Sequence, residues 1–86
     1  MQQDQALIER LVTEFIVGYM SYFSGDYLVE TYTDSDTRVE VIRQVTQAAF
    51  TNAYALTRMY QCGASTTEVV AEASRKGWEY VPTIGG

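Results

Sequence analysis

A long segment near the start of this chain carries apolar side chains at helical spacing. They recur in pairs about every fourth position: Leu7-Ile8, Leu11-Val12, Phe15-Ile16 and Tyr19-Met20. This repeat is typical of an amphipathic α-helix with one broad apolar face. Gly18 lies inside the segment, and a glycine there costs about 1 kcal/mol relative to alanine. We predict a helix over residues 4–24, with either a kink or a close helix–helix approach at Gly18.

A second apolar pattern predicts a longer helix over residues 37–62. Thr37 and Glu40 have the spacing of a capping box at its start. Gly63 follows its last turn, where a glycine commonly ends a helix. Apolar side chains cover most of the circumference of this segment. A helix of that kind is normally covered on more than one side, so we expect it to be central.

Ser65 and Glu68 form a second capping-box pattern, and they predict a third helix over residues 65–76. Gly77 fits the position that follows a helix, where a left-handed backbone is common. We expect the tail, residues 79–86, to be loosely ordered. Four apolar residues are available to pin part of it to the core: Trp78, Tyr80, Val81 and Ile84.

These patterns predict an all-α fold, a compact three-helix domain that spans residues 1–86. The first two helices are long enough to form an antiparallel hairpin, with the shorter third helix packed across its end. A chain of this length buries roughly 60% of its unfolded surface. Two long apolar helices against a thin third one leave part of a stripe uncovered. Because such a patch is usually buried between chains, we expect a homodimer.

The composition offers few groups for catalysis. The chain has no histidine, the commonest general base and metal ligand. Cys62 has no imidazole to activate it, so we interpret it as a small buried residue. Asp34 and Asp36 form a D-x-D pair, but valines stand where a calcium loop needs glycine and glutamate, at positions 39 and 45. We therefore predict no enzyme, no cofactor and no metal.

Charge limits the partners further. Six basic residues against eleven acidic ones give a net charge of −5, which disfavours unaided binding to nucleic-acid phosphates or anionic membranes. Apolar runs such as residues 15–17 are far shorter than a membrane span. The polar N-terminus does not resemble a signal peptide. We expect a cytoplasmic protein, in the host cytoplasm if its origin is viral.

The connection between the first two helices is the predicted binding site. Neither helical period explains residues 26–36, which are compatible with a loop, a short helical turn or a brief strand. Six residues in it are acidic or aromatic: Asp26, Tyr27, Glu30, Tyr32, Asp34 and Asp36. For Tyr27 and Tyr32 a place in the core and a place at an interface are equally compatible with the sequence. Tyrosine is enriched at protein interfaces, and the acids suit a basic partner surface.

Three further tyrosines of the first two helices, Tyr19, Tyr22 and Tyr54, are expected in the core. We therefore predict a small, acidic, non-catalytic protein-binding module. Inhibitors and accessory proteins of phages and mobile elements have this size and acidity.

A second function stays open. Residues 56–73 resemble the opening of helix-turn-helix regulators, with four residues in favoured positions: Gly63, Ser65, Glu68 and Val69. The resemblance implies a dimeric DNA-binding regulator that uses residues 56–81. The segment that should provide the recognition helix, residues 74–81, contains only Arg75 and Lys76 as basic residues.

Overall fold

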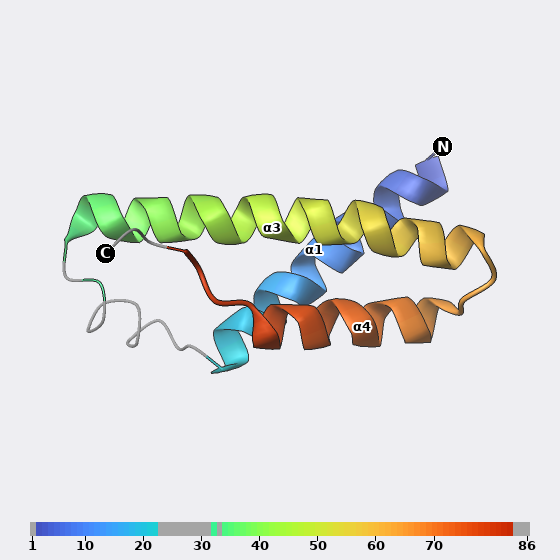
Figure 1. Cartoon of the computed structure of the whole chain (residues 1–86). Helices are drawn as coiled ribbons and strands as arrows, with labels where there is room; N and C mark the ends of the chain where they lie inside the picture. Colours follow the sequence, from blue (N-terminus) through green and yellow to red (C-terminus); the bar gives the residue numbers. More distant parts are fainter. Residues whose placement is uncertain (1, 23–31, 33, 84–86) are drawn as a thin grey trace.

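The computed structural model describes residues 2–22, 32 and 34–83. They form three helices: α1 (Gln2–Tyr22), α3 (Ser35–Gln61) and α4 (Thr66–Glu79). No strand occurs among these residues, and the predicted all-α three-helix fold is confirmed. In Figure 1, α3 and α4 run antiparallel while α1 lies obliquely across both. The contact between α1 and α4 is the most extensive of the three, so α4 packs along α1 and not only across the end of a hairpin.

Two glycines bring α1 and α4 into direct backbone contact. A Cβ atom on Gly18 would lie closer than 3.0 Å to the carbonyl oxygen of Ser74, and one on Gly77 would do the same at Phe15. Gly18 therefore permits a close helix approach, as its position in the sequence indicated. The expectation that Gly77 ends the helix is wrong, because α4 continues to Glu79. The helix crossing therefore explains the glycine at position 77. A left-handed backbone does not, because among the described residues only Gly63 adopts one.

The core is divided into two clusters that share α1. The first joins all three helices: Ile8, Leu11, Ala53, Leu56, Val69 and Ala73. The second joins α1 to the first half of α3: Phe15, Tyr19, Val41, Val45 and Ala49. Helix α1 is therefore the central helix, and the expectation that residues 37–62 form it is wrong. The contact of α3 with α4 is the smallest of the three, so much of α3 stays exposed.

Helix α3 begins earlier than its sequence pattern indicated. Asp34 is the N-cap residue, and its carboxylate accepts hydrogen bonds from the backbone N–H of Thr37 at 2.9 Å and from the Thr37 hydroxyl at 3.1 Å. The predicted capping box at Thr37 and Glu40 is wrong, because Asp34 already caps the helix and engages the Thr37 side chain.

The joint between α3 and α4 matches its predicted chemistry. Gly63 has φ +111°, and its N–H donates to the Tyr60 carbonyl at 3.1 Å. The N–H of Ala64 donates to the Met59 carbonyl at 3.0 Å, which completes a Schellman motif. Both hydrogen bonds of the Ser65–Glu68 capping box are present.

Part of the tail is fixed against α3. The Gln44 side chain accepts from the Thr83 N–H at 2.9 Å and donates to the Thr83 carbonyl at 3.1 Å. The Tyr80 ring lies 5.8 Å from the ring of Phe15 and 6.3 Å from that of Tyr19. Burial raises the pKa of Tyr80. Among the other expected anchors, Trp78 and Val81 are exposed and Ile84 lies outside the described residues.

Candidate functional site

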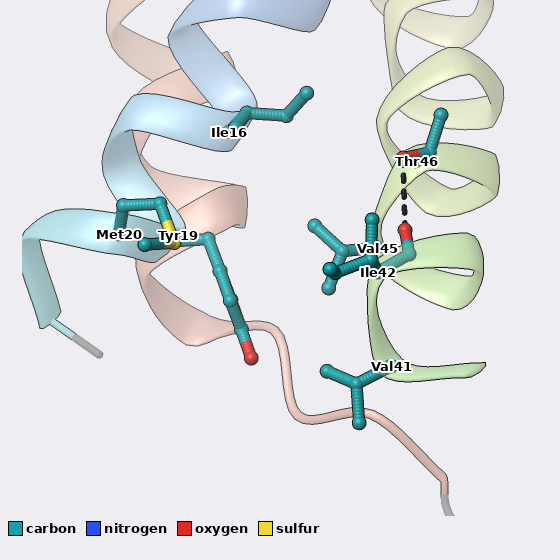
Figure 2. A pocket seen from close by; sticks show the side chains of 7 residues that line it. All are labelled: Ile16, Tyr19, Met20, Val41, Ile42, Val45 and Thr46. Atoms are coloured by element: carbon teal, nitrogen blue, oxygen red, sulfur yellow. Dashed lines mark hydrogen bonds between the residues drawn. The ribbon is translucent and has the colours of Figure 1, made fainter. Parts of the chain in front are cut away.

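An apolar groove opens between the second half of α1 and the first half of α3. Figure 2 shows its lining, which consists of Ile16, Tyr19, Met20, Val41, Ile42, Val45 and Thr46. We call this feature, with a volume of about 240 Å³, the α1–α3 groove. Val41 and Tyr19 are buried in it, whereas Ile42 is 57% exposed.

The groove suits an apolar group and not a charged one. Its side-chain polar atoms are the hydroxyls of Tyr19 and Thr46. The Thr46 hydroxyl donates to the Ile42 carbonyl at 2.8 Å, within α3. The described residues contain no buried side-chain nitrogen or oxygen atom that lacks a hydrogen-bond partner, so no orphaned polar group marks a polar ligand there.

A row of exposed side chains continues from the groove along α3. Ile42, Thr46, Phe50 and Tyr54 follow one another at intervals of four residues, and we call this set the α3 ridge. Residues four apart form one continuous row on a helix surface. Phe50 is 43% exposed and Tyr54 is 59% exposed, so the expectation that Tyr54 fills the core is wrong. Tyr19, by contrast, is buried as expected, and the Tyr22 side chain lies outside the described ones.

The α3 ridge was not among the site residues predicted from the sequence. The apolar residues of α3 surround most of the helix, so periodicity alone does not indicate which half another helix covers. The available signal was the small number of apolar positions in the third helix, which predicted an uncovered stripe but not its location.

The predicted site in the connection is described only at its end. Asp26, Tyr27 and Glu30 lie outside the described residues. Tyr32 is partly buried against the cluster that contains Phe15, and its carbonyl accepts a hydrogen bond from the Arg38 guanidinium at 3.0 Å. Packing within the protein therefore explains why part of the Tyr32 side chain is buried.

The two described aspartates at the start of α3 are exposed. Hydrogen bonds from the Thr37 backbone and hydroxyl lower the pKa of Asp34. Asp36 lies in the first turn of α3, where a carboxylate complements the helix dipole. Both side chains are thus part of the helix start, and both stay accessible to a basic partner.

Two arginines are engaged with neighbouring acids. Arg43 contacts Glu40 at 2.6 Å, and this hydrogen bond, with one from Gln44, lowers the pKa of Glu40 from 4.5 to about 2. Arg75 binds Glu72 and also Glu79, the latter at 2.7 Å. One of the two basic residues in the candidate DNA-recognition segment is therefore already paired.

The described residues hold no metal-binding cluster, and their cysteine lies at the surface. Residues 2–22, 32 and 34–83 contain no group of three or more histidine, cysteine or acidic side chains able to hold a metal ion. Cys62 is exposed, so the interpretation of it as a buried residue is wrong; it is the C-cap of α3, at the surface turn into α4.

None of the described helices is both long enough and apolar enough to cross a bilayer. Comparisons of the chain with family models, curated proteins and solved structures give no match.

Proposed function

We propose that this protein is a small, acidic, non-catalytic binding module that acts as a homodimer and covers a basic surface of a partner protein. The observation that carries the proposal is the α3 ridge beside the α1–α3 groove. Monomeric proteins rarely leave a large contiguous apolar surface in water, and such patches mark interaction sites. The ridge also carries Phe50 and Tyr54, and aromatic residues are enriched at protein interfaces.

Electrostatics supports a basic partner. The net charge is −5, and Asp34 and Asp36 are exposed at the start of α3. Acids grouped at one end of a small protein accelerate its encounter with a positively charged surface. A phage or mobile-element inhibitor that works in the host cytoplasm is the kind of protein that this combination suits.

Two observations weigh against the DNA-binding alternative. The helices of a helix-turn-helix meet at about 90–120°, whereas α3 and α4 run antiparallel (Figure 1). Arg75, which would have to meet a phosphate or a base, is held between Glu72 and Glu79. Both features favour the binding module.

The test is a pull-down in which three double variants are compared with the wild type. Tyr27→Ala with Tyr32→Ala removes the aromatic residues of the connection, and Ile42→Ala with Phe50→Ala removes the centre of the ridge. Val17→Ala with Val81→Ala, at exposed valines that belong neither to the ridge, nor to the groove lining, nor to the connection, is the matched control. We expect one protein to be captured by the wild type and the control but lost from at least one test variant. Equal capture by all variants would refute the proposal.

A gel-shift series at increasing salt addresses the alternative. A DNA-binding regulator must lose affinity steeply as salt rises, because phosphate contacts release counterions. We expect no shift at any salt concentration.

A further inference from the structure

We infer that the α3 ridge pairs with the α3 ridge of a second copy of this chain, in an antiparallel arrangement centred between Thr46 and Gln47. This inference rests on the proposed function and specifies its homodimer. A two-fold axis brings the same patch of both chains together, so the patch must be complementary to itself. The order of side chains along the ridge meets this condition.

The two halves of the exposed surface differ in kind. Val39 and Ile42 precede Thr46 and are aliphatic, whereas Phe50 and Tyr54 follow it and are aromatic. When two such helices run antiparallel about a point between residues 46 and 47, Val39 lies level with Tyr54 of the partner. Ile42 and the partner's Phe50 come within one residue of each other. Each aliphatic side chain thus meets an aromatic one, and the small Thr46 permits close approach at the centre.

The α1–α3 groove accommodates the aromatic side chain that this pairing delivers. Ile42 forms part of the groove lining, so Phe50 of one protomer lies over the groove of its partner. An apolar cavity of about 150 Å³ is large enough to take benzene. The groove has about 240 Å³ and an apolar lining, so a phenyl ring fits it. Aromatic anchors seated in a partner's pocket are the usual hot spots of interfaces.

The charges at the two ends of α3 favour the same orientation. Asp36 and Arg58 are both exposed, and neither forms an ion pair within the part of the chain that the structure describes. In the antiparallel pair, Arg58 of one protomer comes within one residue of the level of Asp36 of its partner at both ends. A parallel pair would instead place each charge opposite its own copy, which is unfavourable.

Size and local charge favour a second copy over a basic partner on this face. The molecule measures 43 × 20 × 19 Å, so its long side offers an area comparable with the ~800 Å² per partner of a standard interface. Glu40 and Arg43, which flank Ile42 in the sequence, neutralise each other at 2.6 Å, and the basic Arg58 follows Tyr54 by four residues. The rim therefore provides no excess of negative charge for a basic ligand, and the acidic end of α3 stays outside the centre of the pair.

Sedimentation equilibrium of the full chain tests the inference. We expect a dimer of twice 9.7 kDa at micromolar concentration. Phe50→Asp should raise the dimer dissociation constant by at least about 30-fold, the scale of a hot spot, without loss of helical circular dichroism. Val17→Asp places the same charge on an exposed valine of α1 and should leave the dimer intact.

Cross-linking tests the antiparallel register. In a Cys62→Ser background, Thr46→Cys should form a disulfide-linked dimer under mild oxidation, whereas Val17→Cys should not. Asp36→Arg should weaken the dimer, and Arg58→Asp in the same chain should restore it. A monomer from micromolar to millimolar concentration, or a Phe50→Asp dimer as tight as the wild type, overturns the inference. A monomeric wild type that still captures a protein partner would refute this pairing while leaving the binding function standing.

Discussion

Gly77 of α4 lies directly against the backbone of Phe15 in α1, with no room for a Cβ atom between the two helices. Gly18 makes the matching approach to Ser74 a turn further along α1. This crossing gives α1 its extensive contact with α4 and sets its oblique course past α3. The α1–α3 groove lies on that course, between the second half of α1 and the first half of α3.

The first prediction follows from this contact. Gly77→Ala should destabilise the protein by about 1–3 kcal/mol, the usual cost of inserting a group into a packed core. By helix propensity alone the same change would stabilise α4 by about 1 kcal/mol. Urea unfolding measures the net effect. A peptide that spans residues 65–80 is the control, because there Gly77→Ala should only increase helicity. A stabilised full-length variant would contradict the close approach.

A pair of phenylalanines separates the core from the exposed surface. Phe15 is 1% exposed and Phe50 is 43% exposed. Phe15→Ala should therefore lower the free energy of unfolding by about 3–5 kcal/mol. Phe50→Ala should cost the monomer clearly less and should act mainly on the dimer. Thermal melts at low protein concentration, where the proposed dimer would dissociate, compare the two directly, and equal losses would contradict the assignment of Phe50 to the surface.

The sequence predicted the first two helices mainly from their apolar patterns and the third from the chemistry at its start. The Ser65–Glu68 box and the turn at Gly63 depend on neighbouring residues only, so the α3–α4 joint was predictable. The packing of the helices was less predictable. Gly77 carries the same local signal whether it ends a helix or lies in a crossing, and only the tertiary partner decides between the two. For the same reason the exposed half of α3 was identified by the structure, since periodicity does not distinguish a covered face from an open one.

The tail offers a third prediction. Tyr80→Ala should destabilise the protein, because the ring packs against Phe15 and Tyr19. Loss of an aromatic side chain from a core costs about 3–5 kcal/mol. Because Tyr80 is only partly buried, we expect a loss at or below the lower end of this range. Tyr80→Phe is the control. The Tyr80 hydroxyl lies 3.5 Å from the Gln44 carbonyl, a distance at which a hydrogen bond contributes little, so this variant should behave like the wild type. Chemical denaturation measures both, and a large loss for Tyr80→Phe would show that the hydroxyl matters.

Acid should weaken the fold through its ion-paired carboxyl groups. Hydrogen bonds from Arg43 and Gln44 hold the pKa of Glu40 near 2, below its ordinary value of 4.5. A group with a lowered pKa in the folded state stabilises that state above its unfolded pKa, and this contribution is lost as the pH falls through the folded pKa. The melting temperature should therefore decrease between about pH 4.5 and pH 2. Glu40→Gln should flatten this part of the profile.

Glu9→Gln is the control for this pH dependence. It removes a carboxylate that forms no ion pair with another residue in the described ranges. The control should retain the steeper decrease of the wild type. Identical profiles for all three proteins would show that the Glu40–Arg43 pair does not contribute to the folded state.

The last prediction concerns the acidic connection and its basic partner. Asp36→Asn removes one exposed charge from the start of α3. It should slow association and reduce its dependence on salt, because charges at the edge of an interface act mainly on the encounter rate. Asp34→Asn removes a second charge but keeps the helix start, since asparagine caps helices about as well as aspartate. Both variants should therefore retain the helical circular dichroism of the wild type.

Tyr27→Ala should act differently from these charge variants. The loss of an aromatic hot spot should weaken the complex by about 2 kcal/mol or more, mainly through faster dissociation. Tyr32→Ala is less clean, because Tyr32 also packs against the core cluster of Phe15 and its removal should lower the melting temperature. Surface plasmon resonance with the captured partner separates the two rates. Unchanged kinetics in Asp36→Asn and Tyr27→Ala would place the partner site outside the connection.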